Sequence, residues 1–380
     1  MSARASRSIA SATQRLYRAY FGVRRRLAAL SVPVPPPPGR LNPLEVRRLL
    51  VVCTGLIGDT IMNLPALCAA RALFPAAELV GLVNPAGRTI LTMARCLDRY
   101  VVCDGAPLRL QPAARRDGRR LEAEVRSGAF DVGVVFLGDD YAPMLTRAGI
   151  PHRVFVADDT YGRLATATYD IDPRTWGPAE RLGAWRALGL EPGRPEVKLS
   201  ASAEARTALS AHVDRPAGRG RIVLHPFGSS QDQWWPSHQV HEFVHHVKAR
   251  LGLECLVIGA GRAAAEAFPR ADGPFRLIDR LNLEQLVALL ETSSLVVSTD
   301  SGPLHLAGAL GRPGVGLFRA SRPEHALRYP SIRPIVGRGL EECQKRCAWD
   351  RCAYSPCRQM STIEPLTVIN EAAALIPARL

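Results

Sequence analysis

Two short stretches of the chain combine a carboxylate with small polar residues, a combination that can bind phosphate or accept a proton. The first, residues 54–60, holds Gly58, Asp59 and Thr60. The second, residues 299–305, holds Asp300, Ser301, Gly302 and His305. A carboxylate can serve as a general base, and a small-residue turn that opens a helix presents backbone N–H groups to an anion. An Asp or Ser at such a turn is equally typical of an ordinary helix cap, so both interpretations stay open at this point.

Each stretch connects a predicted buried strand to a predicted helix. Residues 48–53 and 295–298 are largely apolar or β-prone runs, which is typical of strands that are covered on both faces. Residues 61–73 and 303–310 read as helices, and Pro303 suits a first helical turn, where its missing N–H is not needed. Both stretches are therefore expected at the carboxyl end of a strand, where α/β proteins bind ligands.

The rest of the chain repeats this alternation. Further strands are predicted at 78–83, 99–103, 130–137, 152–156, 221–225, 254–259, 275–278 and 315–318, with helices between most of them. Alternating strands and helices predict an α/β fold with parallel sheets covered by helices. Because residues 158–215 interrupt the pattern, we expect two facing Rossmann-like domains with a ligand-binding cleft between them.

The expected organisation has five parts, and a length of 380 residues suits two domains with extensions. The parts are a basic amphipathic tail (1–32), a proline-rich linker (33–47), a first Rossmann-like domain (48–200), a second one (201–342), and a cysteine-rich segment with a C-terminal helix (343–380).

The positive charge of the chain is concentrated at its start. Residues 1–48 hold ten Arg and one acid, so they carry +9 of the formal net charge of +14. The tail also has apolar residues at helix-like spacing, which suits a helix lying on an anionic membrane surface; a transit peptide and a disordered tail are the alternatives. No apolar run reaches the roughly 20 residues that cross a bilayer. The weakly charged remainder predicts no nucleic-acid partner.

The two turns and a third stretch together resemble a known enzyme family. Residues 49–67, with Gly58 and Asp59 in their turn, resemble the first strand, turn and helix of the family 9 glycosyltransferases, the heptosyltransferases that build the inner core of lipopolysaccharide. His225-Pro-Phe-Gly-Ser-Ser230, Trp235-Pro236 and Thr299-Asp-Ser-Gly-Pro-Leu-His305 resemble the second-domain motifs of that family in the same order. The resemblance covers roughly residues 48–375.

The resemblance implies a GT-B fold and an inverting transfer that needs no metal or other cofactor, with ADP-heptose as the donor in the best-known members. Asp59 matches the proposed catalytic base, and Gly58 and Thr60 would lie on the acceptor side. Donor-contacting positions are matched by Ser229, Ser230, Gln233, Gly259, Asp300, Ser301, Gly302 and His305. The acceptor would be a lipopolysaccharide core or a related glycan or glycolipid. The expected location is cytoplasmic, peripheral on the inner face of the inner membrane.

One position departs from the family pattern. Members usually carry a Lys before the Trp-Pro pair, where its charge neutralises the donor diphosphate, and this chain has Gln233 there. A Gln amide cannot supply a full charge to a leaving phosphate. Either Arg262, Arg319 or Arg322 replaces it, or the donor or the rate differs. The chain could also be a catalytically weak member that binds a sugar nucleotide or glycan.

Three further patterns could indicate other chemistry. Cys343, Cys347, Cys352 and Cys357 could hold structural zinc or iron, with free or disulfide-linked cysteines as the alternative. Gly259-Ala-Gly-Arg-Ala-Ala264, followed by Asp279, imitates a dinucleotide-binding fingerprint and leaves an NAD-dependent dehydrogenase open. Four histidines share one predicted helix, where surface positions are expected rather than a metal site: His238, His241, His245 and His246.

Overall fold

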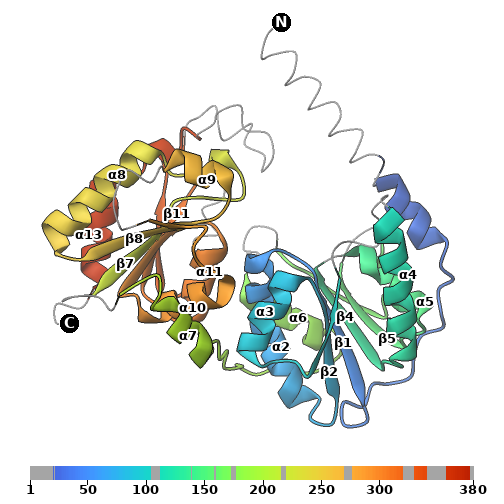
Figure 1. Cartoon of the computed structure of the whole chain (residues 1–380). Helices are drawn as coiled ribbons and strands as arrows, with labels where there is room; N and C mark the ends of the chain where they lie inside the picture. Colours follow the sequence, from blue (N-terminus) through green and yellow to red (C-terminus); the bar gives the residue numbers. More distant parts are fainter. Residues whose placement is uncertain are drawn as a thin grey trace, which may run out of the picture.

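The computed structural model describes residues 20, 22–103, 112–137, 139–157, 160–172, 177–214, 220–268, 276–319, 329–339 and 357–376. Two six-stranded sheets form its framework (Figure 1). Every strand pairing within these residues is parallel. The predicted α/β class with two Rossmann-like sheets is confirmed.

The first sheet has the strand order β3-β2-β1-β4-β5-β6. Its strands are β1 (Arg48–Cys53), β2 (Glu78–Val83), β3 (Arg99–Val102), β4 (Val132–Leu137), β5 (His152–Val156) and β6 (Ala167–Tyr169). The main helices between them are α2 (Ile57–Leu73), α3 (Pro85–Ala94), α4 (Pro112–Ser127) and α5 (Ala142–Arg147). Residues 49–53 are completely buried, which is the pattern of a central strand with helices on both faces.

The second sheet has the strand order β12-β11-β10-β7-β8-β9. Its strands are β7 (Arg221–His225), β8 (Glu254–Gly259), β9 (Arg276–Ile278), β10 (Leu295–Thr299), β11 (Gly314–Phe318) and β12 (Ile332–Val336). Its helices are α8 (Ser237–His246), α9 (Arg262–Ala267), α10 (Leu283–Thr292) and α11 (Gly302–Ala309), and α13 (Pro365–Leu375) packs beside α8 (Figure 1). The 299–305 turn therefore follows β10, an inner strand of this sheet.

The sequence pattern missed two strands and placed the start of α2 at residue 61, four residues later than Ile57, so Gly58, Asp59 and Thr60 lie in the first turn of the helix. β6 has only three residues and β12 contains Pro334, and both lie at sheet edges, where Pro is tolerated. Helix α3, one of the helices expected between the strands, begins at Pro85. Asn84 caps it, because the Asn84 Oδ1 accepts a hydrogen bond from the Gly87 N–H at 2.7 Å.

The segment between the two sheets is attached to the first domain through α2. Helices η3 (Pro178–Leu182) and α6 (Gly183–Arg186) pack against α2. There the Trp185 Nε1–H donates to the Ala66 carbonyl at 2.8 Å. Residues 190–202, which follow, form neither helix nor strand.

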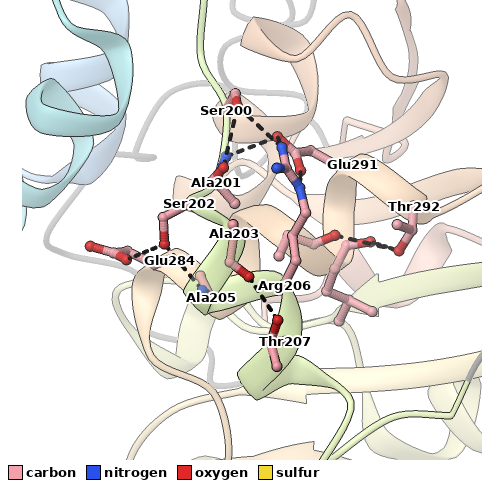
Figure 2. A network of polar contacts seen from close by, with 12 residues as sticks. Ser200, Ala201, Ser202, Ala203, Ala205, Arg206, Thr207, Glu284, Glu291 and Thr292 are labelled. Atoms are coloured by element: carbon pink, nitrogen blue, oxygen red, sulfur yellow. Dashed lines mark hydrogen bonds and ion pairs between the residues drawn. The ribbon is translucent and has the colours of Figure 1, made fainter.

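The same segment is attached to the second domain through α10, against which α7 (Ala203–Leu209) packs. The Ala201 N–H and the Arg206 Nε both donate to the Glu291 carboxylate, at 2.9 and 3.0 Å (Figure 2). Ser202 caps α7, and its Oγ lies 3.5 Å from a Glu284 carboxylate oxygen. The connection is thus anchored by fixed contacts in each domain.

Candidate functional site

The two turns singled out in the sequence lie against each other, although they belong to different sheets. Helices α2 and α11 pack together, each through its first turn. A Cβ placed on Gly58 would lie 2.6 Å from the His305 Cδ2, and one on Gly302 would lie 3.3 Å from the Ile57 Cγ2. Only a residue without a side chain fits at position 58 while His305 keeps its place.

Asp59 occupies the third position of α2 and folds back over the turn. Its Oδ2 accepts a hydrogen bond from the Leu56 N–H at 2.9 Å. A Cβ on Gly55 would lie 2.6 Å from the Asp59 Cβ, so this glycine gives the carboxylate its place. Asn84, which precedes α3, also holds this turn, because its Nδ2 donates to the Thr54 and Gly55 carbonyls at 3.2 and 2.7 Å. Asp59 therefore caps α2, and its carboxylate is held in one orientation.

An arginine that the sequence did not single out lies beneath this turn. Arg181, in η3, has no exposed surface and belongs to the segment that packs on α2. Burial lowers the pKa of Arg181, while the neighbouring Tyr169, Asp59 and Glu180 oppose that change. A buried cation thus stands near the Asp59 carboxylate and favours its ionised form. The mixed segment around residue 181 carries no pattern that would have indicated this.

In the second domain, Ser301 connects β7, β10 and α11. Its Oγ lies 3.0 Å from the His225 Nδ1 and 3.0 Å from the Ser298 Oγ. It also donates to the Thr299 carbonyl at 3.2 Å. These bonds fix the turn before α11. The N-terminus of α11 therefore points toward the first domain, and its free backbone N–H groups favour the binding of an anion there.

His305 is buried, with 6% of its surface exposed, and is held from two sides. Its Nδ1 lies 3.0 Å from the Tyr329 hydroxyl, and its Nε2 lies 3.7 Å from the Asp300 Oδ1. Tyr329 comes from just before β12, so no local motif could have indicated it. Asp300 and His305 thus form one polar group beside Gly58.

His225 makes stability sensitive to acid. Burial lowers its pKa from 6.5 to about 4. In the unfolded chain His225 is protonated below about pH 6.5, whereas in the folded protein it stays neutral down to about pH 4. The contribution of His225 to the free energy of unfolding is therefore fully present above pH 6.5. It falls by up to about 1.4 kcal/mol per pH unit as the pH drops toward 4. Denaturant unfolding across this range should show a shallower pH slope for His225→Gln than for wild type. Equal slopes would assign the acid sensitivity to other groups.

Gln233 does not extend from its turn as a free polar group. It is 8% exposed, and its Oε1 accepts hydrogen bonds from the Ser229 N–H and the Ser229 Oγ, both at 3.1 Å. Ser230 beside it is exposed. The Gln233 side-chain amide is therefore hydrogen-bonded within the turn after β7. This position, where the family pattern has Lys, carries no positive charge.

The arginines considered as replacements lie in different surroundings. Arg262, at the start of α9, has a 92% exposed side chain and pairs with Glu266 at 2.6 Å. Arg319 directly follows β11, the strand hydrogen-bonded to β10, and so lies at the same sheet edge as Asp300. Arg322 lies outside the described residues. Arg319 is the better placed of the two described ones.

The imitation of a dinucleotide fingerprint has a structural explanation. The Asp279 Oδ1 accepts a hydrogen bond from the Gly261 N–H at 2.7 Å, so this acid closes the loop after β8. A Cβ on Gly259 would lie 2.6 Å from the Phe227 ring, which gives the glycine a packing role. In a dehydrogenase, this carboxylate would accept hydrogen bonds from the ribose hydroxyls of the cofactor. Here it accepts a hydrogen bond from the backbone of the protein itself.

The four-cysteine pattern, which could hold zinc or iron, lies largely outside the described residues. Within those residues, no three His, Cys, Asp or Glu side chains are grouped to hold a metal. Cys343, Cys347 and Cys352 lie outside the described residues, and Cys357 is buried. Of the α8 histidines, His241 stacks on Phe268 with ring centroids 4.5 Å apart.

A polar cavity of about 390 Å³ opens between α3 of the first domain and α10 of the second. Arg88, Thr89 and Thr92 of α3 form one wall, and Glu284 of α10 forms another. The cavity offers cationic, hydroxyl and carboxylate groups of the kind that bind sugars.

Two parallel sheets whose strand-to-helix turns face each other define a GT-B glycosyltransferase fold. A solved structure with this fold, heptosyltransferase WaaC of Escherichia coli with ADP, superposes with a TM-score of 0.66 at 17% identity, over 86% of this chain and 99% of that one. The family model for glycosyltransferase family 9 (heptosyltransferase) matches residues 119–352. The chain belongs to this family and is a glycosyltransferase, so the dehydrogenase alternative is wrong.

Two curated relatives carry heptosyltransferase names. Lipopolysaccharide heptosyltransferase 1 of Escherichia coli K12 is 24% identical over 296 residues, which is 73% of this chain and 89% of that protein. Lipopolysaccharide core heptosyltransferase OpsX of Haemophilus influenzae is 36% identical over 72 residues, 19% of this chain and only about a fifth (21%) of its own length.

Proposed function

We propose that this protein transfers heptose from ADP-heptose to a lipopolysaccharide core or a related glycan acceptor, in the cytoplasm and with inversion at the anomeric carbon. The observation that carries the proposal is the meeting of the Asp59 turn with the Asp300–His305 turn across the domain boundary. The names of the relatives and the ADP in the similar solved structure support the choice of donor.

The proposed mechanism assigns one task to each side of the cleft. An acceptor hydroxyl attacks the anomeric carbon, and Asp59 takes its proton as the new C–O bond forms and the bond to the ADP oxygen breaks. Asp300, Ser301 and His305 bind the donor, with the N-terminus of α11 and Gly302 facing its phosphates. Gly58 borders the acceptor, whereas Thr60 is completely buried and supports the turn by donating to the Leu56 carbonyl. Ser229, Ser230 and Gly259 complete the donor side.

A second candidate, a weak enzyme that binds the donor with little turnover, is favoured by one observation. Gln233 is neutral: its oxygen accepts from Ser229, and its amide N–H groups can donate a hydrogen bond to a phosphate but supply no positive charge to departing ADP. Incubation with ADP-heptose and a heptose-free core acceptor separates the two candidates. Transfer requires both ADP release and a heptosylated product, whereas donor binding with neither outcome supports the weak enzyme. Binding of a different nucleotide sugar alone would refute the heptose donor.

We propose Arg319 as the cation that replaces the missing Lys. Arg319→Met is expected to weaken ADP binding by about 10-fold or more, because a charge-assisted bond to phosphate is lost. Arg262→Met removes the same charge from an exposed arginine that is paired with Glu266, and should leave ADP binding unchanged. Calorimetric titration of both variants with ADP checks this. Equal losses would indicate a general electrostatic effect and remove Arg319 from the site.

The four-cysteine pattern stays a prediction of structural zinc or iron, and the proposed transfer does not depend on it.

A further inference from the structure

The helix formed by residues 22–30 is attached to the first domain by one face. Ala29 and the following Val32 are buried, in an apolar cluster that includes Val125 of α4. The Arg25 Nε pairs with the Asp140 Oδ1 at 2.6 Å. Arg163 donates to the Ala29 carbonyl and, at 3.1 Å, to the Val32 carbonyl. The helix, drawn in blue beside α4 in Figure 1, is therefore fixed to the domain.

The opposite face of this helix is apolar and exposed. The exposed fractions are 41% for Tyr20, 58% for Val23, 60% for Leu27 and 70% for Leu30. With successive residues about 100° apart, these four positions fall within an arc of about 80°, and Ala29 lies opposite. Arg24 and Arg26 lie on the two sides of this arc. We call this surface the apolar face.

We propose that the apolar face docks the protein on an anionic lipid bilayer. An apolar stripe flanked by arginines is the composition of helices that lie in a membrane interface. The segment 1–48 carries a formal charge of +9, which attracts anionic headgroups. A second copy of the same face would bring like charges together, which disfavours a dimer here. The described part of the chain contains no helix able to span a membrane.

The attachment also connects the apolar face to the acceptor side of the site. Asp140, which pairs with Arg25, belongs to η1 (Asp139–Tyr141), just after the carboxyl end of β4. The next residue, Tyr141, is hydrogen-bonded to the side chain of Thr54, the first residue of the Asp59 turn. Docking would therefore hold this turn near the lipid surface, where a glycolipid acceptor resides. This delivery step rests on the proposed function, whereas docking itself does not.

Sedimentation with vesicles tests the docking. Wild type should bind vesicles of phosphatidylcholine mixed with phosphatidylglycerol more tightly than vesicles of phosphatidylcholine alone. Replacing Val23, Leu27 and Leu30 together by Ser should weaken binding by about 100-fold, because three apolar side chains no longer leave water. Leu366→Ser, on α13 with 38% exposure, is the matched control and should bind like wild type. Unchanged binding of the triple variant, or a triple variant that turns a dimer into a monomer, would overturn the proposal.

Arg25→Gln tests the delivery step, since it breaks the pairing with Asp140 and keeps the apolar face. Vesicle binding should persist, while transfer to an acceptor embedded in vesicles should fall relative to transfer to a soluble acceptor fragment. An unchanged ratio of the two rates would refute delivery. If wild type binds vesicles but transfers to neither acceptor, the proposed function fails and the docking stands.

Discussion

Asp59→Asn should lower the rate of sugar transfer by at least about 100-fold, because an amide cannot take the proton of the attacking hydroxyl. Asparagine keeps the size of the side chain, and its oxygen can still accept the hydrogen bond from the Leu56 N–H. Loss of a helix cap costs about 1 kcal/mol of stability and would not slow the enzyme that remains folded. Rate and stability therefore distinguish a base from a cap.

Arg181 adds a second consequence to this substitution. The buried guanidinium would lose a neighbouring negative charge, so some loss of thermal stability is expected in addition to the loss of rate. Glu180→Gln is the matched control, because it removes another carboxylate near Arg181 without touching the turn. It should change the melting temperature and leave transfer near the wild-type rate. An Asp59→Asn variant that melts early yet transfers normally once folded would make Asp59 a cap alone.

The sequence predicted the parts of the fold that depend on local pattern. Residues 49–53 and 295–297 are apolar without alternation, and this alone places them inside a sheet covered on both faces. A turn at the end of such a strand must lie at the ligand-binding edge, so the positions of both polar turns followed from the same argument.

The contacts between distant segments could not be predicted in this way. That His305 lies against Gly58 depends on how the two domains meet, and Tyr329 reaches His305 from a segment without any motif. Arg181 was missed because a buried charge in an irregular segment has no periodic signature. The sequence marked Gln233 as a departure from the family, but only the structure shows its amide bound to Ser229.

Gly58→Ala should slow transfer by about 10- to 100-fold without unfolding the protein, since misplacing a site residue by about 1 Å can cost that much. The new Cβ would lie 2.6 Å from the His305 Cδ2 and 3.0 Å from its Nε2, closer than carbon atoms pack. His305 is held by Tyr329 and Asp300, so the ring can yield only by breaking those contacts or by parting α2 from α11.

Stability should change little, because the preference of a helix for Ala offsets part of the cost of displacing His305. Within a helix, Ala is favoured over Gly by up to about 1 kcal/mol, so a variant that melts like wild type but transfers slowly locates the damage at the contact between domains. Gly162→Ala is the matched control, because nothing lies within 4 Å of the added Cβ and the change is on the same domain. Steady-state transfer and thermal melting of both variants make the comparison. If Gly58→Ala transferred as fast as Gly162→Ala, the close approach of α2 to His305 would have no part in the reaction.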